Sequence, residues 1–235
     1  MFFFEPNPEV VAHNSAALGE GLALAERMAA AHLSALQELE RIDMTDSVTL
    51  QAEAGLLYHA LNMFAELMDQ VLGGRFDTAL YLLRPTFDIG SMIFVTRRSE
   101  ELARQMIEEQ LSASDARKHV VEMLREAGFA EEADRIESDW KRESKNIQFA
   151  SHVHVQHLFG LLEEREGGSV AIAGGRPDEG EALRQGRIAI AGEMRTLSYF
   201  RSNHGEDLTA EIRSELERLE AATRAWLTDA TEYDE

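Results

Sequence analysis

The chain has 235 residues, of which 44% are hydrophobic, so it is long enough to bury a full core. It contains no cysteine, which excludes disulfides, thiolate metal sites and a cysteine nucleophile. Its 43 Asp and Glu residues outnumber 23 Lys and Arg, and the formal charge of −20 disfavours generic binding to nucleic acids or anionic membranes.

The first residues, MFFFEPNPEVV, include three consecutive phenylalanines but no basic segment and no apolar run of signal-peptide length. No stretch approaches the roughly 18 uncharged apolar residues that a transmembrane helix needs. We therefore expect a cytoplasmic protein with no membrane segment and no cofactor. Because no linker-like stretch divides it, we expect residues 1–235 to form a single helical domain.

Helical periodicity predicts two long amphipathic helices at the start of an all-α fold. The first follows Pro8 and continues to about Ile42, and the second begins near Ser47 and ends at Gly73. Their apolar positions alternate in steps of four and three residues, which favours an antiparallel pair. His32 lies in the first apolar stripe, and we interpret it as a buried, hydrogen-bonded histidine rather than a ligand.

The segment from Arg75 to Arg98 is the most apolar helix-length stretch, so we expect it to be central. Arg84 and Asp88 are four residues apart within it. They form either an internal salt bridge that fixes the register of the helix or a polar site that faces a pocket. Both belong to a narrow polar stripe made of Asp77, Tyr81, Arg84, Asp88 and Ser91.

Residues 99–144 have the pattern of shorter, more charged helices and predict a peripheral helical excursion on one side of the bundle. After a histidine-containing helix over 145–166, the segment 167–180 holds five of the 16 glycines and predicts a flexible loop. Two more helices are expected, from about Asp178 to Asn203 and from Thr209 to Thr228. The whole pattern is that of an antiparallel bundle of about eight helices.

Three histidines occur together in the sequence SHVHVQH of residues 151–157. His154 and His157 would share one face of a helix, as two metal ligands could. The carboxylate-bundle motif Glu-x-x-His is absent, however, so we favour one buried and two surface histidines and assign no metal. A metalloprotein that uses His154 and His157 is the alternative.

The sequence LLRPTFD of residues 82–88, followed much later by SHVH at 151–154, resembles a pattern found in bacterial helical proteins of unknown function. In those proteins an Arg-Pro-x-Phe-acid stretch on one helix is followed by Ser and His near the start of another. Their fold is suspected to be similar to the HEPN class of small helical domains. The resemblance implies that one polar cluster is formed by Arg84, Asp88, Ser151 and His154.

Active HEPN domains resemble one another in an Arg-x4-6-His motif that cleaves RNA without a metal. This chain departs from that motif, because Arg142 lies too far before His152, Arg195 lies too far before His204, and Arg201 lies too close to His204. We therefore interpret the chain as having no arginine at the required spacing before a histidine. Arg84 and His154 could still supply the two groups from different helices, one to stabilise a phosphate charge and one to move a proton. That gives one hypothesis, an RNA-cleaving or nucleotide-modifying enzyme.

The acidic charge and the departure from the motif favour a different function. We expect a non-catalytic helical domain that binds a protein partner or a small ligand and forms a homodimer. In this interpretation Arg84 and Asp88 organise its polar centre.

Overall fold

The computed structural model describes residues 7–41, 47–138, 141 and 177–229. Within these ranges every regular element is a helix and no strand occurs, which confirms the all-α prediction. The elements are α1 (Pro8–Leu18), α2 (Glu20–Arg41), α3 (Val48–Leu72), α4 (Phe76–Arg98), α5 (Glu100–Ile107), α6 (Ala113–Glu126), α8 (Glu179–His204), the 3-10 turn η2 (Gly205–Asp207) and α9 (Ala210–Asp229), with a further helical stretch over 130–138.

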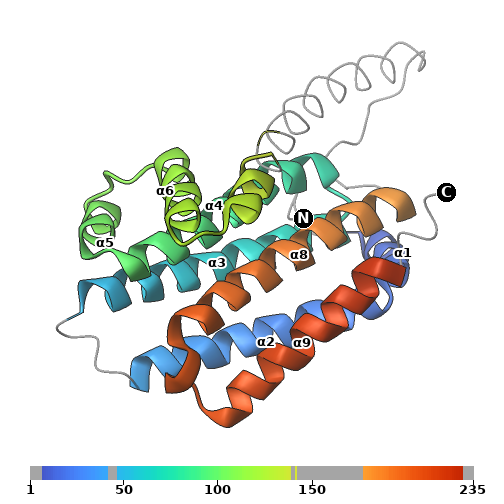
Figure 1. Ribbon diagram of the computed structural model, residues 1–235. Helices are drawn as coiled ribbons and strands as arrows, with labels where there is room; N and C mark the ends of the chain where they lie inside the picture. The colour runs from blue at the N-terminus through green and yellow to red at the C-terminus, as the bar shows by residue number, and fades with distance from the viewer. Residues whose placement is uncertain (1–6, 42–46, 139–140, 142–176, 230–235) are drawn as a thin grey trace.

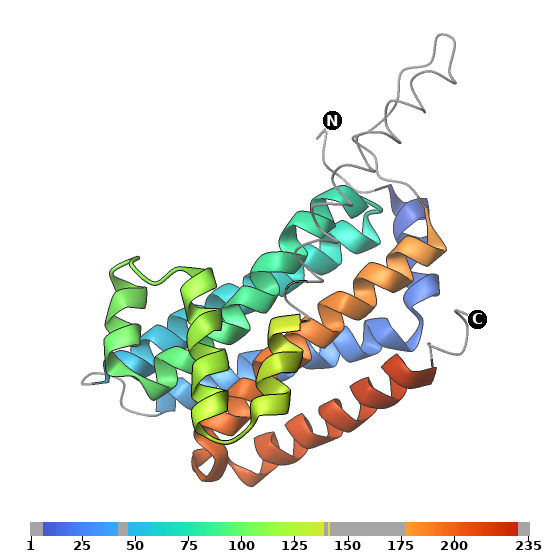
Figure 2. The same cartoon turned by 45° about the horizontal axis from the view of Figure 1, so that its top comes forward.

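The helix α8 occupies the middle of the bundle and packs against α1, α2, α3, α4 and α9. Figures 1 and 2 show α2 and α3 as a long antiparallel pair, as predicted, with α9 running along α2 on the side away from α3. α5 packs against α3 and α4, and α6 packs against α4. Among the described helices none is long and apolar enough to cross a membrane.

Apolar side chains form two clusters. The main core joins the long helices and includes the fully buried Phe64, Ile93 and Phe200. A smaller cluster connects the end of α4 to the helices that follow it and contains Val95, Leu102, Leu111, Ala116 and Val120. Residues after Ser99 therefore build a second, small hydrophobic cluster on the side of α4.

Several helix ends lie where local signals predicted them. The Ser47 hydroxyl accepts a hydrogen bond from the Leu50 amide at 3.3 Å and caps the start of α3. α3 ends before Gly74, whose φ of +68° is the left-handed conformation that glycine adopts easily. α6 begins after Ser112, whose hydroxyl accepts a hydrogen bond from the Asp115 amide at 3.1 Å.

The prediction of one continuous helix up to about Ile42 is wrong at Gly19. This residue has φ +51° and separates α1 from α2. Just before the break, the buried Asn14 side chain donates from Nδ2 to the carbonyls of Val71 at 3.3 Å and Leu72 at 3.1 Å. Its Oδ1 accepts the Asp178 amide at 3.2 Å. One side chain thus holds the end of α3 and the start of α8 against α1.

Two glycines inside helices allow close packing of neighbouring side chains. A Cβ atom added to Gly21 on α2 would lie 2.3 Å from the ring of Trp226 on α9. At Gly186 on α8, the added Cβ would lie 2.3 Å from the side chain of Leu18 on α1. Intrachain packing therefore explains both glycines.

Candidate functional site

The predicted polar cluster is only partly within the described structure. Asp88 lies on α4 with 13% of its side chain exposed, and its Oδ1 is 3.2 Å from Nη1 of Arg117 on α6, which is 9% exposed. For Arg84 the backbone alone is described. Outside the described residues lie Ser151, His154 and His157. The four-residue cluster, the Arg84 and His154 pair and the histidine metal site therefore stay predictions.

A buried network joins the ends of α3, α4 and α8 around the carboxylate of Glu53, which is fully buried. Its Oε2 lies 2.8 Å from Nε2 of His204, and its Oε1 accepts a hydrogen bond from Nδ2 of Asn203 at 2.8 Å. Nε of Arg97 approaches Oε2 at 3.6 Å. The carboxylate is thus surrounded by a histidine, an amide and a guanidinium, which are the partners that a buried charge needs.

The outer part of this network has a cationic and aromatic edge. Arg98 donates to Oδ1 of Asn203 at 2.6 Å, and its guanidinium lies 3.7 Å from the centre of the Phe94 ring. Burial lowers the pKa of Arg98 from its ordinary value, and the nearby Glu53 carboxylate opposes that shift. Tyr199 packs against Phe94, and burial raises the pKa of its hydroxyl. The edge therefore continues the interior network rather than forming a separate open site.

A second buried pair joins α2 to α8. Nδ1 of His32 and Oε1 of Glu193 are hydrogen-bonded, and both side chains are 0% exposed. The interpretation of His32 as a buried, hydrogen-bonded histidine is therefore confirmed. Its partner comes from 161 positions further along the chain.

The Arg-x4-6-His spacing does occur once, at Arg27 and His32, and sequence reasoning missed it. The structure separates the two groups. The Arg27 side chain is 46% exposed and pairs with Glu215 on α9 at 2.8 Å, whereas His32 is sealed against α8. A substrate phosphate at Arg27 would therefore be out of reach of the His32 ring.

Metal chemistry finds no support in the described part of the chain, where no three His, Asp or Glu side chains are close enough together to hold an ion. The carboxylate and histidine groups described above occur as pairs that each link two helices. They are arranged to fix how the helices pack.

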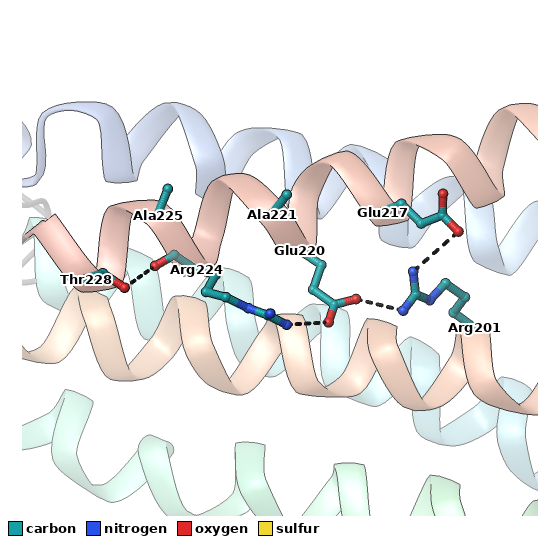
Figure 3. A pocket seen from close by; sticks show the side chains of 7 residues that line it. All are labelled: Arg201, Glu217, Glu220, Ala221, Arg224, Ala225 and Thr228. Atoms are coloured by element: carbon teal, nitrogen blue, oxygen red, sulfur yellow. Dashed lines mark hydrogen bonds and ion pairs between the residues drawn. The ribbon is translucent and has the colours of Figure 1, made fainter.

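A shallow groove of about 610 Å³ lies between α8 and α9 (Figure 3). Glu220 is the centre of its charge pattern, because Arg201 lies 2.7 Å from one carboxylate oxygen and Arg224 lies 3.1 Å from the other. Glu217 also approaches Arg201 at 3.7 Å. These four charges neutralise one another, so a charged ligand would have to displace pairs that are already formed.

The comparisons with known proteins identify no relative. No family model matches the sequence, and no curated protein or solved structure is detectably similar to it. The functional argument therefore rests on the surfaces of the chain itself.

One helix presents a surface of a different kind. Between residues 48 and 65 of α3 the only charged residue is Glu53, which is fully buried, so this stretch exposes no charge. Tyr58 is 64% exposed at its middle. We name this outward surface the α3 face. It consists of Val48, Gln51, Gly55, Tyr58, Asn62 and Ala65, and the exposed His59 and Glu66 lie along one edge of it. The spacing of these residues is visible in the sequence, opposite the apolar stripe of the same helix.

Proposed function

We propose that the chain is a helical protein-interaction domain and that the α3 face is its binding surface. The observation that carries this proposal is the absence of exposed charge over residues 48–65 in a chain with 28% charged residues and a net charge of −20. Charged residues are depleted at the centres of protein interfaces, and tyrosine is enriched there. An exposed, uncharged helix with Tyr58 at its middle has this composition.

The buried polar groups also support the proposal, because their contacts are those of structural pairs. Glu53, His32 and Asp88 each have a partner on a different helix, and each pair is largely shielded from water. These contacts favour a structural role, in which Asp88 and Arg117 hold α6 on α4. A cytoplasmic location belongs to the proposal, because a chain without cysteine is compatible with a reducing compartment.

A photo-cross-linking experiment tests the proposal. The amino acid p-benzoylphenylalanine replaces Tyr58 in cells that express the full chain, and the matched control places it at Ser214, an exposed position on α9. We expect a discrete cross-linked adduct from position 58, its loss when Asn62→Arg is added, and no equivalent adduct from position 214. The absence of any adduct at position 58 would remove the proposal.

A further inference from the structure

We infer that the α3 face binds a second copy of this chain, with the two α3 helices antiparallel around a two-fold axis. This inference rests on the proposed function. The residues of the α3 face follow one another in steps of three, four, three, four and three, so their spacing is the same in both directions from a point between Leu56 and Leu57. A two-fold axis through that point pairs every residue of the face with another member of it, beginning with Val48 against Ala65 at the two ends.

The chemistry of the remaining pairs is complementary. Gly55 of one copy meets Tyr58 of the other, so the largest side chain of the face lies over the residue that has none. Gln51 meets Asn62, and two side-chain amides can donate and accept hydrogen bonds with each other. The axis repeats both contacts, which is the self-complementarity that a two-fold interface requires.

Gly55 supplies an independent argument, because nothing in the described part of the chain requires a glycine there. A Cβ atom added at Gly55 would meet no atom of the described residues within 4 Å, whereas the same atom at Gly21 or Gly186 would lie 2.3 Å from a packed side chain. Glycine in the middle of a helix is less favourable than alanine. A tyrosine ring from another molecule, resting directly on the backbone, explains why this position lacks a side chain.

The net charge of the molecule also favours the α3 face as the surface that joins two copies. Two copies that each carry −20 repel one another, and a two-fold contact through an acidic surface would bring like charges together. The six residues of the α3 face carry no charge, and the exposed Glu66 lies at its edge, so the repulsion that opposes the contact comes from groups outside the six residues. Salt screens that repulsion. Self-association through the α3 face should therefore strengthen as salt is added, whereas a contact through the ion pairs of the α8 and α9 groove should weaken.

The lack of cysteine in the chain makes a direct test possible. Two full-length variants are prepared, Gln51→Cys and Asn62→Cys, and each is oxidised alone and in an equimolar mixture. In the antiparallel pair, position 51 of one copy is adjacent to position 62 of the other. Two copies of position 51 are separated by roughly 16 Å along the helix axis, which is beyond the reach of a disulfide. We expect a reducible covalent dimer from the mixture and little from either variant alone.

A matched control uses Ser214→Cys and Ala225→Cys, two exposed positions on α9 with the same separation along their helix. Their mixture should give no covalent dimer. Circular dichroism and the urea midpoint of each variant show that the substitutions leave the fold intact.

Three outcomes are informative. A covalent dimer from the Gln51→Cys and Asn62→Cys mixture supports the inference. A dimer in solution without that disulfide places the contact on another surface and overturns it. A chain that stays monomeric at all concentrations also overturns it. The cross-linking result at position 58 then distinguishes a failure of this inference from a failure of the proposed function. An adduct heavier than the chain by the mass of a different protein keeps the proposed function with another partner, and no adduct removes both.

Discussion

The buried pair of His32 and Glu193 makes a quantitative prediction about stability. Each side chain is 0% exposed, and each has a second polar atom, Nε2 of the histidine and Oε2 of the carboxylate, without a hydrogen-bond partner in the described structure. Replacing one member by leucine leaves the other polar and buried, and should reduce the free energy of unfolding by about 3–5 kcal/mol. Replacing both with leucine removes all the polar side-chain atoms of this pair. The free energy of unfolding of the double variant should therefore lie within about 1.5 kcal/mol of the wild-type value.

Urea unfolding followed by circular dichroism measures these differences in the His32→Leu, Glu193→Leu and double variants. For a chain of this size, the single variants should also melt roughly 6–20 °C lower. The exposed pair of Arg27 and Glu215 is the matched control, because it too begins on α2. Arg27→Met should change stability by no more than about 1 kcal/mol. A double variant whose loss equals the sum of the two single losses would refute the assignment of the pair as a coupled unit.

Other consequences can be measured on the same material. Asn14→Leu removes three hydrogen bonds at a buried position and should destabilise by about 2–4 kcal/mol in urea unfolding. Gly21→Ala drives a Cβ atom into the ring of Trp226 and should destabilise by about 1–3 kcal/mol, whereas Gly55→Ala, measured at concentrations where the chain is a monomer, should stabilise by about 0.5–1 kcal/mol. Because burial raises the pKa of Tyr199 in the folded state, its unfolded form loses the proton first, and stability should fall as the pH rises above the ordinary tyrosine range. A Tyr199→Phe variant should flatten that part of the stability profile, and an unchanged alkaline profile would contradict the assignment.

Much of the fold was predictable from local sequence signals. Periodic apolar positions located the long helices, and capping residues such as Ser47 and Asp178 set their starts within a residue or two. The break at Gly19 was missed for a physical reason. The apolar pattern continues after it, and the contacts of Asn14 that accompany the break involve residues 57 to 164 positions away.

The candidate sites were less predictable, because a sequence does not show which helix faces meet. The contact of Asp88 with Arg117 on α6 was not predicted. The expected partners of Asp88, the Arg84 side chain and His154, lie outside what the structure describes, so those pairings stay predictions. Nothing in the sequence around Glu193 indicates that it pairs with His32. Recognising the α3 face required less information from the structure. Its spacing and composition are visible in the sequence, and the additional fact was that the single charged residue of that stretch, Glu53, points into the core.

Sedimentation velocity of the full-length chain tests the central claim most directly. The wild type should sediment as a dimer whose fraction rises with protein concentration and with salt. Tyr58→Lys should sediment as a monomer, because two like charges would enter the contact, while its circular dichroism spectrum and urea midpoint at monomeric concentrations stay close to those of the wild type. A wild type that remains monomeric over the whole concentration range, or a Tyr58→Lys variant that dimerises as well as the wild type, would contradict the assignment of the α3 face as the surface that joins two copies.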